Sequence, residues 1–148
     1  MGIISFIKGV GAKLHGASED KPAAPEVLKQ EIAKQGLPAD KVDVAVAGST
    51  VTITGKTAST EEAEKIALTV GNSVGVSQVA NNIVVEKPAP EARMYTVQKG
   101  DNLSKIAEAM YGKGKANEYH RIFNANKPML KSADLIYPGQ VLRIPPLA

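Results

Sequence analysis

The chain has 148 residues, of which 43% are hydrophobic and 22% are charged, and it contains no cysteine and no tryptophan. This composition is typical of a soluble globular protein, and the length suits one ordinary domain or two small ones. Without cysteine the chain has no disulfide framework, no thiolate metal site and no cysteine nucleophile.

Charge is distributed unevenly along the chain. Residues 1–87 carry nine Lys and ten acidic residues, whereas residues 91–148 carry nine basic and five acidic residues. This difference indicates two unlike halves. An excess of four positive charges without a basic run is a weak signal for nucleic acid, so we expect no nucleic-acid partner.

The first residues, MGIISFIKGVGAKLHG, are apolar at the start but lack the features of a signal peptide. Such a peptide has a basic n-region followed by an uninterrupted apolar run of about 7–15 residues. No stretch of the chain approaches the roughly 20 apolar residues of a membrane span. We therefore expect a cytoplasmic protein, monomeric and without a membrane partner.

The apolar residues of this first segment recur at helical spacing and predict a short amphipathic helix over residues 3–14. Such a helix either lies on a membrane surface or packs on the protein's own core. Gly9, Gly11 and Gly16 each weaken a free-standing helix by about 1 kcal/mol relative to alanine. We favour packing on the core, because a weak helix needs tertiary support.

Residues 25–87 predict the order helix, strand, strand, helix, strand. A Pro-Glu start and a following glycine delimit a helix over 25–35. Alternating apolar residues around a Gly-Ser turn predict a hairpin over 42–55. A capping box, Ser-x-x-Glu, starts a helix over 59–70, and a third strand follows over 76–85.

This order of elements resembles the BON domain, a small α/β module of bacterial proteins. The segment TVTITGKTAS adds to the resemblance, because a glycine commonly follows the second strand in that family, as Gly55 does here. The resemblance implies an association with phospholipids or the cell envelope.

Three segments of the second half carry a more specific pattern: YTVQKGDNLSKIA at 95–107, IFNAN at 122–126 and IYPGQVLRIP at 136–145. They resemble the LysM domain nearly position by position. The residues also predict a strand over 95–97, a helix from Asn102, a helix near 117–126 and a strand over 141–144.

We therefore predict an α+β fold of two small domains. A BON domain (αββαβ) with an extra N-terminal helix occupies residues 1–87. A Pro/Ala-rich linker follows at 88–93, and a LysM domain (βααβ) occupies residues 94–148.

The sequence contains no pattern for catalysis. His15 and His120 lie far apart and outside any metal or nucleophile motif, and no G-x-S-x-G segment is present. Glu61, Glu62 and Glu64 fall in the first turns of a predicted helix, where capping and the helix dipole explain them. We predict a binding protein and not an enzyme.

The loop GNSVGV at 71–76 is suited to a monovalent cation. A weakly hydrated ion needs several neutral oxygens, commonly backbone carbonyls, and this loop follows a helix C-terminus where the last carbonyls are unpaired. The negative end of the helix dipole also favours a cation there. From these residues alone, however, a plain helix end is the stronger interpretation.

A BON domain followed by a LysM domain in a short chain is similar to the family of bacterial cytoplasmic potassium-binding proteins, sensors or buffers of the ion. The resemblance implies that potassium is held by main-chain carbonyls. We expect the ion to tie the N-terminal segment to the 71–76 loop and so to order the BON domain, with rubidium or caesium as alternative ions. It implicates the carbonyls of Ile7, Val10, Ala12, Gly71, Ser73 and Val76.

Carbohydrate binding in the cell envelope is the alternative, since LysM domains commonly hold N-acetylglucosamine chains such as peptidoglycan. The resemblance places that groove at Gly100, Asp101, Asn102, Leu103, Met129, Leu130, Ile136 and Tyr137. For Met129, Leu130 and Ile136, packing against the BON domain is the slightly stronger interpretation.

Overall fold

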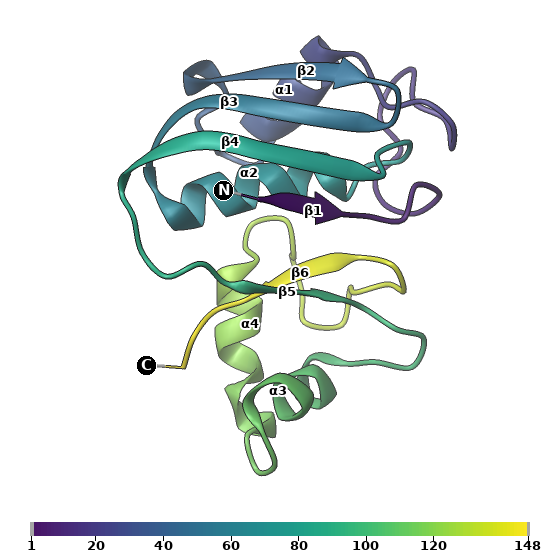
Figure 1. Cartoon of the computed structure of the whole chain (residues 1–148). Coiled ribbons are helices and arrows are strands. Elements are labelled where there is room, and N and C mark those ends of the chain that lie inside the picture. The colour runs from purple at the N-terminus through teal and green to yellow at the C-terminus, as the bar shows by residue number, and fades with distance from the viewer. Residues whose placement is uncertain (1, 148) are drawn as a thin grey trace.

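The computed structural model describes residues 2–147 and arranges them as two halves, one above the other in Figure 1. The N-terminal half contains β1 (Ile3–Ser5), α1 (Pro25–Lys34), β2 (Val42–Ala47), β3 (Thr50–Ser59), α2 (Thr60–Gly71) and β4 (Gln78–Lys87). The C-terminal half contains β5 (Arg93–Thr96), α3 (Leu103–Tyr111), α4 (Tyr119–Ala125) and β6 (Val141–Ile144). Short 3-10 helices span Ala39–Lys41 and Ala116–Glu118. The predicted α+β class is confirmed.

The sheet of the N-terminal half has the strand order β1-β4-β3-β2. β2 and β3 form the predicted antiparallel hairpin, in which Val46 pairs with Val51. β3 and β4 run parallel and are joined through α2. The predicted order of helix, strand, strand, helix and strand over residues 25–87 is therefore confirmed.

The predicted N-terminal helix over residues 3–14 is wrong. Residues 3–5 form β1, which pairs antiparallel with β4, and the chain then continues as a loop. Pairing with β4 satisfies the strand's backbone groups on one edge. The alternative helix over residues 3–14 would contain Gly9 and Gly11, each of which weakens a helix. The segment still packs on the protein, as expected: Phe6 is buried, although Ile3 and Ile7 stay exposed.

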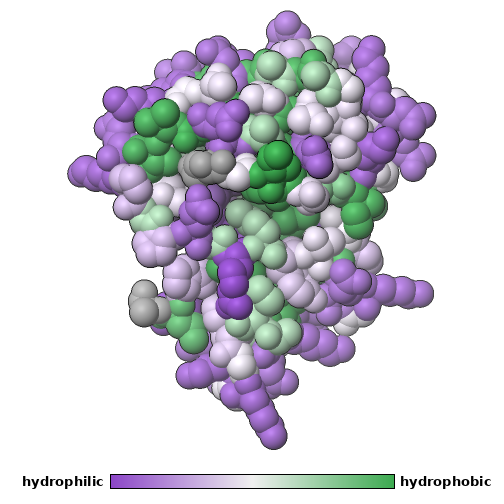
Figure 2. All heavy atoms as spheres, in the orientation of Figure 1, coloured by the Kyte–Doolittle hydropathy of each residue, from purple (hydrophilic) through white to green (hydrophobic). Residues whose placement is uncertain are grey.

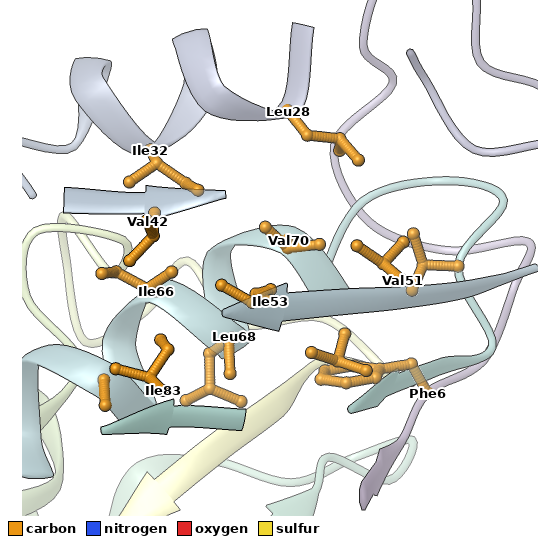
Figure 3. Packing of buried hydrophobic residues seen from close by; sticks show 14 of the residues in the cluster. Phe6, Leu28, Ile32, Val42, Val51, Ile53, Ile66, Leu68, Val70 and Ile83 are labelled. Atoms are coloured by element: carbon orange, nitrogen blue, oxygen red, sulfur yellow. The ribbon is translucent and has the colours of Figure 1, made fainter. Parts of the chain in front are cut away.

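The core of the N-terminal half lies between the sheet and its two helices (Figure 3). Side chains from both helices meet side chains from the sheet, and each fully buried one contributes about 1.5–3 kcal/mol to folding. Its largest members are Leu28 and Ile32 of α1, Val51 and Ile53 of β3, Ile66 and Leu68 of α2, and Val42 of β2.

The C-terminal half has the predicted order of strand, helix, helix and strand. β5 and β6 pair antiparallel, with Tyr95 opposite Leu142. The Asn102 side chain caps α3 by accepting a hydrogen bond from the Lys105 N–H at 2.8 Å. The second helix begins at Tyr119, two residues later than predicted, because a 3-10 turn precedes it.

The surface is largely hydrophilic, but apolar atoms gather in the middle of the face drawn in Figure 2, at the level of β1 and where the two halves meet. Ile3 of β1 is 66% exposed. Within residues 2–147, every helix is too short or too polar to cross a membrane.

Candidate functional site

Two segments that are far apart in the sequence, residues 6–12 and 71–77, lie side by side at the end of α2. Backbone hydrogen bonds join them: Phe6 N–H to Ser77 O, Ala12 N–H to Asn72 O and Gly75 N–H to Lys8 O at 2.8 Å, and Val74 N–H to Ala12 O at 2.9 Å. A parallel β-bridge links Ala12 to Ser73. We call these two segments the paired loops.

All six residues predicted to hold a cation lie on the paired loops. The carbonyls of Ile7, Ala12 and Ser73 each accept one backbone hydrogen bond. Those of Val10, Gly71 and Val76 accept none within residues 2–147. Because a carbonyl oxygen has two lone pairs, each of the six retains capacity for a cation.

Two glycines allow the paired loops to approach this closely. Gly11 has a φ of +109°, and a Cβ there would lie 2.2 Å from the Asn72 carbonyl oxygen. A Cβ on Gly71 would lie 1.9 Å from the ring of Phe6. A side chain at either position would therefore push the loops apart.

Asn72 lies between two of the predicted ligands and connects the paired loops to the C-terminal half. Its side chain is buried and makes two hydrogen bonds of 2.8 Å with Val141 of β6. The amide Nδ2 donates to the Val141 carbonyl, and Oδ1 accepts from the Val141 N–H. One side chain thus pairs with a strand edge that would otherwise lack partners.

Asn126 of the C-terminal half pairs with the same edge of β6 in the same way. Its Oδ1 accepts from the Arg143 N–H at 2.8 Å, and its Nδ2 donates to the Arg143 carbonyl at 2.9 Å. The outer edge of β6 is therefore covered by two asparagine side chains, one from each half of the chain.

A second contact between the halves involves the turn before β6. A Cβ on Gly139 would lie 2.7 Å from Val10 Cγ2 and 3.4 Å from Ile7 Cδ1. The side chains of two residues in the first paired loop therefore rest directly on this turn.

A buried ion pair forms the third contact. Glu64 of α2 and Arg143 of β6 are 3% and 6% exposed, and their charged atoms lie 2.8 Å apart. Glu64 also accepts a hydrogen bond from the Ala92 N–H. Burial raises the pKa of Glu64 above its usual value, while the hydrogen bond and charge of Arg143 act in the opposite direction. Glu64 is thus an interface residue, and its interpretation as a helix-capping residue is corrected.

Comparison with known proteins identifies both halves. A BON domain model matches residues 21–87 and a LysM domain model matches residues 95–145. The chain is 45% identical to the Potassium binding protein Kbp of Escherichia coli O6:H1 (strain CFT073), over 98% of this chain and 99% of that protein. The chain belongs to the Kbp family. An uncharacterized protein of Deinococcus radiodurans is 37% identical over 70% of this chain and 44% of that protein.

The residues predicted to bind carbohydrate do not line one common groove. Asn102 and Leu103 line a surface groove of about 430 Å³ together with Tyr119 and Asp134. Met129 and Tyr137 line a cleft of about 260 Å³ between the BON and LysM domains.

The remaining residues of this predicted set have structural contacts. Leu130 and Ile136 pack in the LysM core, whereas Met129 packs against both domain cores. Packing against the BON domain therefore holds for Met129 alone. Gly100 and Asp101 form the turn before α3, where Asp101 accepts hydrogen bonds from the Tyr95 hydroxyl at 2.6 Å and from the Gln98 N–H at 2.8 Å.

The Tyr95–Asp101 hydrogen bond makes stability depend on pH in the alkaline range. It raises the pKa of Tyr95 from 10.0 to about 12. Since the unfolded chain releases this proton near 10, the stabilisation is complete below pH 10 and is lost as the pH rises toward 12. Burial also raises the pKa of Tyr111 and Tyr137, so Tyr95 is identified by difference: we expect the ultraviolet absorbance change near pH 12 to be smaller by one phenol in Tyr95→Phe than in the wild type. In Asp101→Asn this phenol should titrate earlier, whereas Asp134→Asn should leave it unchanged; an unaltered titration in Asp101→Asn would contradict the assignment.

Sequence reasoning missed the side chains that join the two domains. In the sequence alone, nothing distinguishes Asn72 from other residues at a helix end, or Arg143 from other charged residues in a short strand. His15 and His120 are exposed, as expected for residues outside any site. Within residues 2–147, no three His, Asp or Glu side chains are grouped to hold a metal ion.

Proposed function

We propose that this protein binds potassium through main-chain carbonyls of the paired loops, with Ile7, Val10 and Ala12 on one loop and Gly71, Ser73 and Val76 on the other. The observation that carries the proposal is the hydrogen-bonded pairing of these loops, with three carbonyls that have no other partner within residues 2–147. Neutral carbonyl oxygens replace the hydration shell of a weakly hydrated cation without adding fixed charge. The name of the E. coli relative supports the same ligand.

Potassium binding would hold the paired loops together and thereby order the domain boundary. Asn72 lies between Gly71 and Ser73, so an ion that fixes those carbonyls also fixes the side chain that binds Val141. An ion that fixes the Val10 carbonyl also fixes the contact between the Val10 side chain and Gly139 of the LysM domain. Ligand binding stabilises the folded state by RT ln(1 + [L]/Kd), about 2.7 kcal/mol at a hundredfold excess over Kd.

A change in stability with potassium concentration suits a sensor or buffer of the ion, and we propose this role for the protein in the cytoplasm. We also propose that it functions as a monomer and has no catalytic activity. Rubidium and caesium, which are also weakly hydrated, should replace potassium. Cell fractionation tests the location.

We expect KCl to raise the melting temperature of dialysed protein and to release or absorb heat on titration, whereas NaCl at equal ionic strength does so much less. Gly11→Ala should abolish the potassium response, because its Cβ would overlap the Asn72 carbonyl oxygen. Gly16→Ala is the matched control: Gly16 also has a positive φ (+81°), but a Cβ there meets nothing within 4 Å. Equal responses to both salts would refute the proposal.

Carbohydrate binding remains a second candidate because the LysM domain retains an open groove beside Asn102 and Leu103. Retention of the protein on purified peptidoglycan, together with a periplasmic location, would favour this function. Free passage through the same material would exclude it.

A further inference from the structure

The outer edge of β1 is a row of unpaired backbone groups. β1 is the last strand of its sheet and pairs with β4 on one side only. The Gly2 carbonyl accepts a hydrogen bond from β4 at 3.1 Å, and the Phe6 N–H donates to the Ser77 carbonyl at 2.8 Å. Backbone groups alternate between the two edges of a strand, so the N–H and carbonyl groups of Ile3 and Ser5 point away from β4. Within residues 2–147, these four groups have no hydrogen-bond partner.

The side chains along this edge do not protect it. Edge strands are commonly blocked by charged side chains. The opposite edge of the sheet follows this rule, because Asp43 of β2 is exposed and lies 4.0 Å from the ammonium group of Lys29. On β1 the residues with outward backbone groups are Ile3, which is 66% exposed, and Ser5, and neither carries a charge. The edge is therefore open to pairing with another extended chain.

A groove of about 190 Å³ lies beside this edge, between the BON and LysM domains. It is lined by Gly2, Ile3 and Ile4 on the side of β1 and by Ala92 and Met94 on the side of β5. In Figure 1, β1 is the strand of the sheet nearest to the C-terminal half, and in Figure 2 apolar atoms gather at its level. The groove therefore offers apolar contacts to a side chain of any segment that pairs with β1.

The groove also carries negative charge. Glu64 and Glu91 both line it. Burial and, to a smaller extent, the charge of Glu91 raise the pKa of Glu64, whereas Arg143 lowers it. Arg143 neutralises Glu64, but the ion pairs among residues 2–147 do not include the exposed Glu91. A partner with a lysine or arginine beside Glu91 would complement this charge.

These features fit a single extended segment better than a second copy of the chain. Stable interfaces between folded proteins bury about 1,200–2,000 Å². β1 has three residues, and the LysM domain borders the groove beside it, so two folded copies have little surface to share there. An extended segment, in contrast, pairs its backbone with the edge and places alternate side chains in the groove.

We propose that β1 is a docking edge for an extended segment of a partner protein, which adds a strand to the BON sheet. The segment has alternating apolar side chains, one of which enters the groove, and a basic side chain that pairs with Glu91. The backbone groups that it uses, those of Ile3 and Ser5, lie outside the paired loops. The interaction is therefore separate from the proposed cation site.

A phage-displayed library of random seven-residue peptides, selected on the whole protein, provides the probe. We expect enriched peptides to alternate apolar residues and to contain a lysine or arginine. By calorimetry, Ser5→Pro should weaken the binding of an enriched peptide at least about tenfold, because it removes an outward N–H without removing a bond to β4. Ser5→Ala keeps this N–H and should bind as the wild type does. Glu91→Gln should weaken binding by up to about fivefold, whereas Glu108→Gln on α3 should leave it unchanged.

Two further measurements do not depend on the folding of a variant. In the wild type, the peptide should slow hydrogen exchange at the amides of Ile3 and Ser5 but not at Ile4, whose amide faces β4. Methylating every second peptide amide should abolish binding when the methylated amides face β1 and should be tolerated when they face away. A library without enriched peptides, equal affinity in Ser5→Pro and wild type, or protection confined to residues outside β1 would overturn the proposal and leave the proposed function intact.

Discussion

Replacing Arg143 with methionine is expected to lower the free energy of unfolding by about 3–5 kcal/mol at neutral pH, since it leaves the buried Glu64 carboxylate without its partner. The pair lies at 2.8 Å with both side chains almost fully enclosed. Urea denaturation of the whole chain measures the loss.

The same variant should acquire a distinctive pH dependence. Burial raises the pKa of Glu64 and Arg143 lowers it, so removing Arg143 raises this pKa further. A carboxyl group with a raised pKa keeps its proton in the folded state at a pH where the unfolded chain has released it. Stability then falls as the pH rises through that interval and recovers as the pH is lowered toward the ordinary value of 4.5. The deficit of Arg143→Met should therefore be smaller at acidic than at neutral pH.

Two further variants isolate the cause. Adding Glu64→Met to Arg143→Met should restore much of the lost stability, because no unpaired charge is then buried. Arg121→Met is the control: Arg121 pairs with Glu118 at the surface, and its loss should cost at most about 1 kcal/mol. A loss in Arg143→Met no larger than in Arg121→Met, or equal at both pH values, would show that the buried pair contributes little.

Asn72→Ala should cost about 2–4 kcal/mol and also uncouple the LysM domain from potassium. The substitution leaves the N–H and carbonyl of Val141 without partners in a buried position, at about 1–3 kcal/mol for each group. In the wild type, we expect potassium to slow hydrogen exchange at amides of β6 as well as in the paired loops. In Asn72→Ala, potassium should still protect the paired loops but no longer protect β6.

Asn126→Ala is the matched control for this experiment. Asn126 makes the same pair of backbone hydrogen bonds to the same strand, but from within the LysM domain. It should destabilise the protein by a similar amount and leave the coupling to potassium intact. Equal loss of coupling in both variants would mean that general loosening of β6, and not the link through Asn72, explains the result.

Sequence signals predicted the elements whose cause is local. The predicted cap at Ser59 is present, since Ser59 Oγ accepts the Glu62 N–H at 3.1 Å; the return bond of a full capping box is shifted by one residue, because Glu62 Oε1 accepts from the Ala58 N–H. Alternating valines and a Gly-Ser turn produced the β2–β3 hairpin. For the N-terminal segment the local signal gave the wrong prediction. Its apolar residues recur at helical spacing, but residues 3–5 pair with the free edge of β4 and form a strand. That edge exists only after residues 78–87 have joined the sheet.

The candidate cation site could not be derived from side chains, because every residue carries a carbonyl and composition does not distinguish the six. Their selection came from the resemblance, and their proximity comes from the pairing of residues 6–12 with 71–77. The interface residues were hidden for a similar reason. Asn72 meets Val141 across 69 residues of chain, and Glu64 meets Arg143 across 79.

The sequence by itself therefore determined that this is a cysteine-free chain of two small α+β units, with the order of elements from residue 25 onward. Capping, alternation and glycine turns act over a few residues, so they can be recognised without the fold. Only the tertiary structure decided that the first residues form a strand with a free outer edge, and that Asn72 and the Glu64–Arg143 pair join the domains. The burial of a side chain and the direction of a carbonyl depend on which distant segments of the chain come into contact. A local sequence pattern does not contain that information.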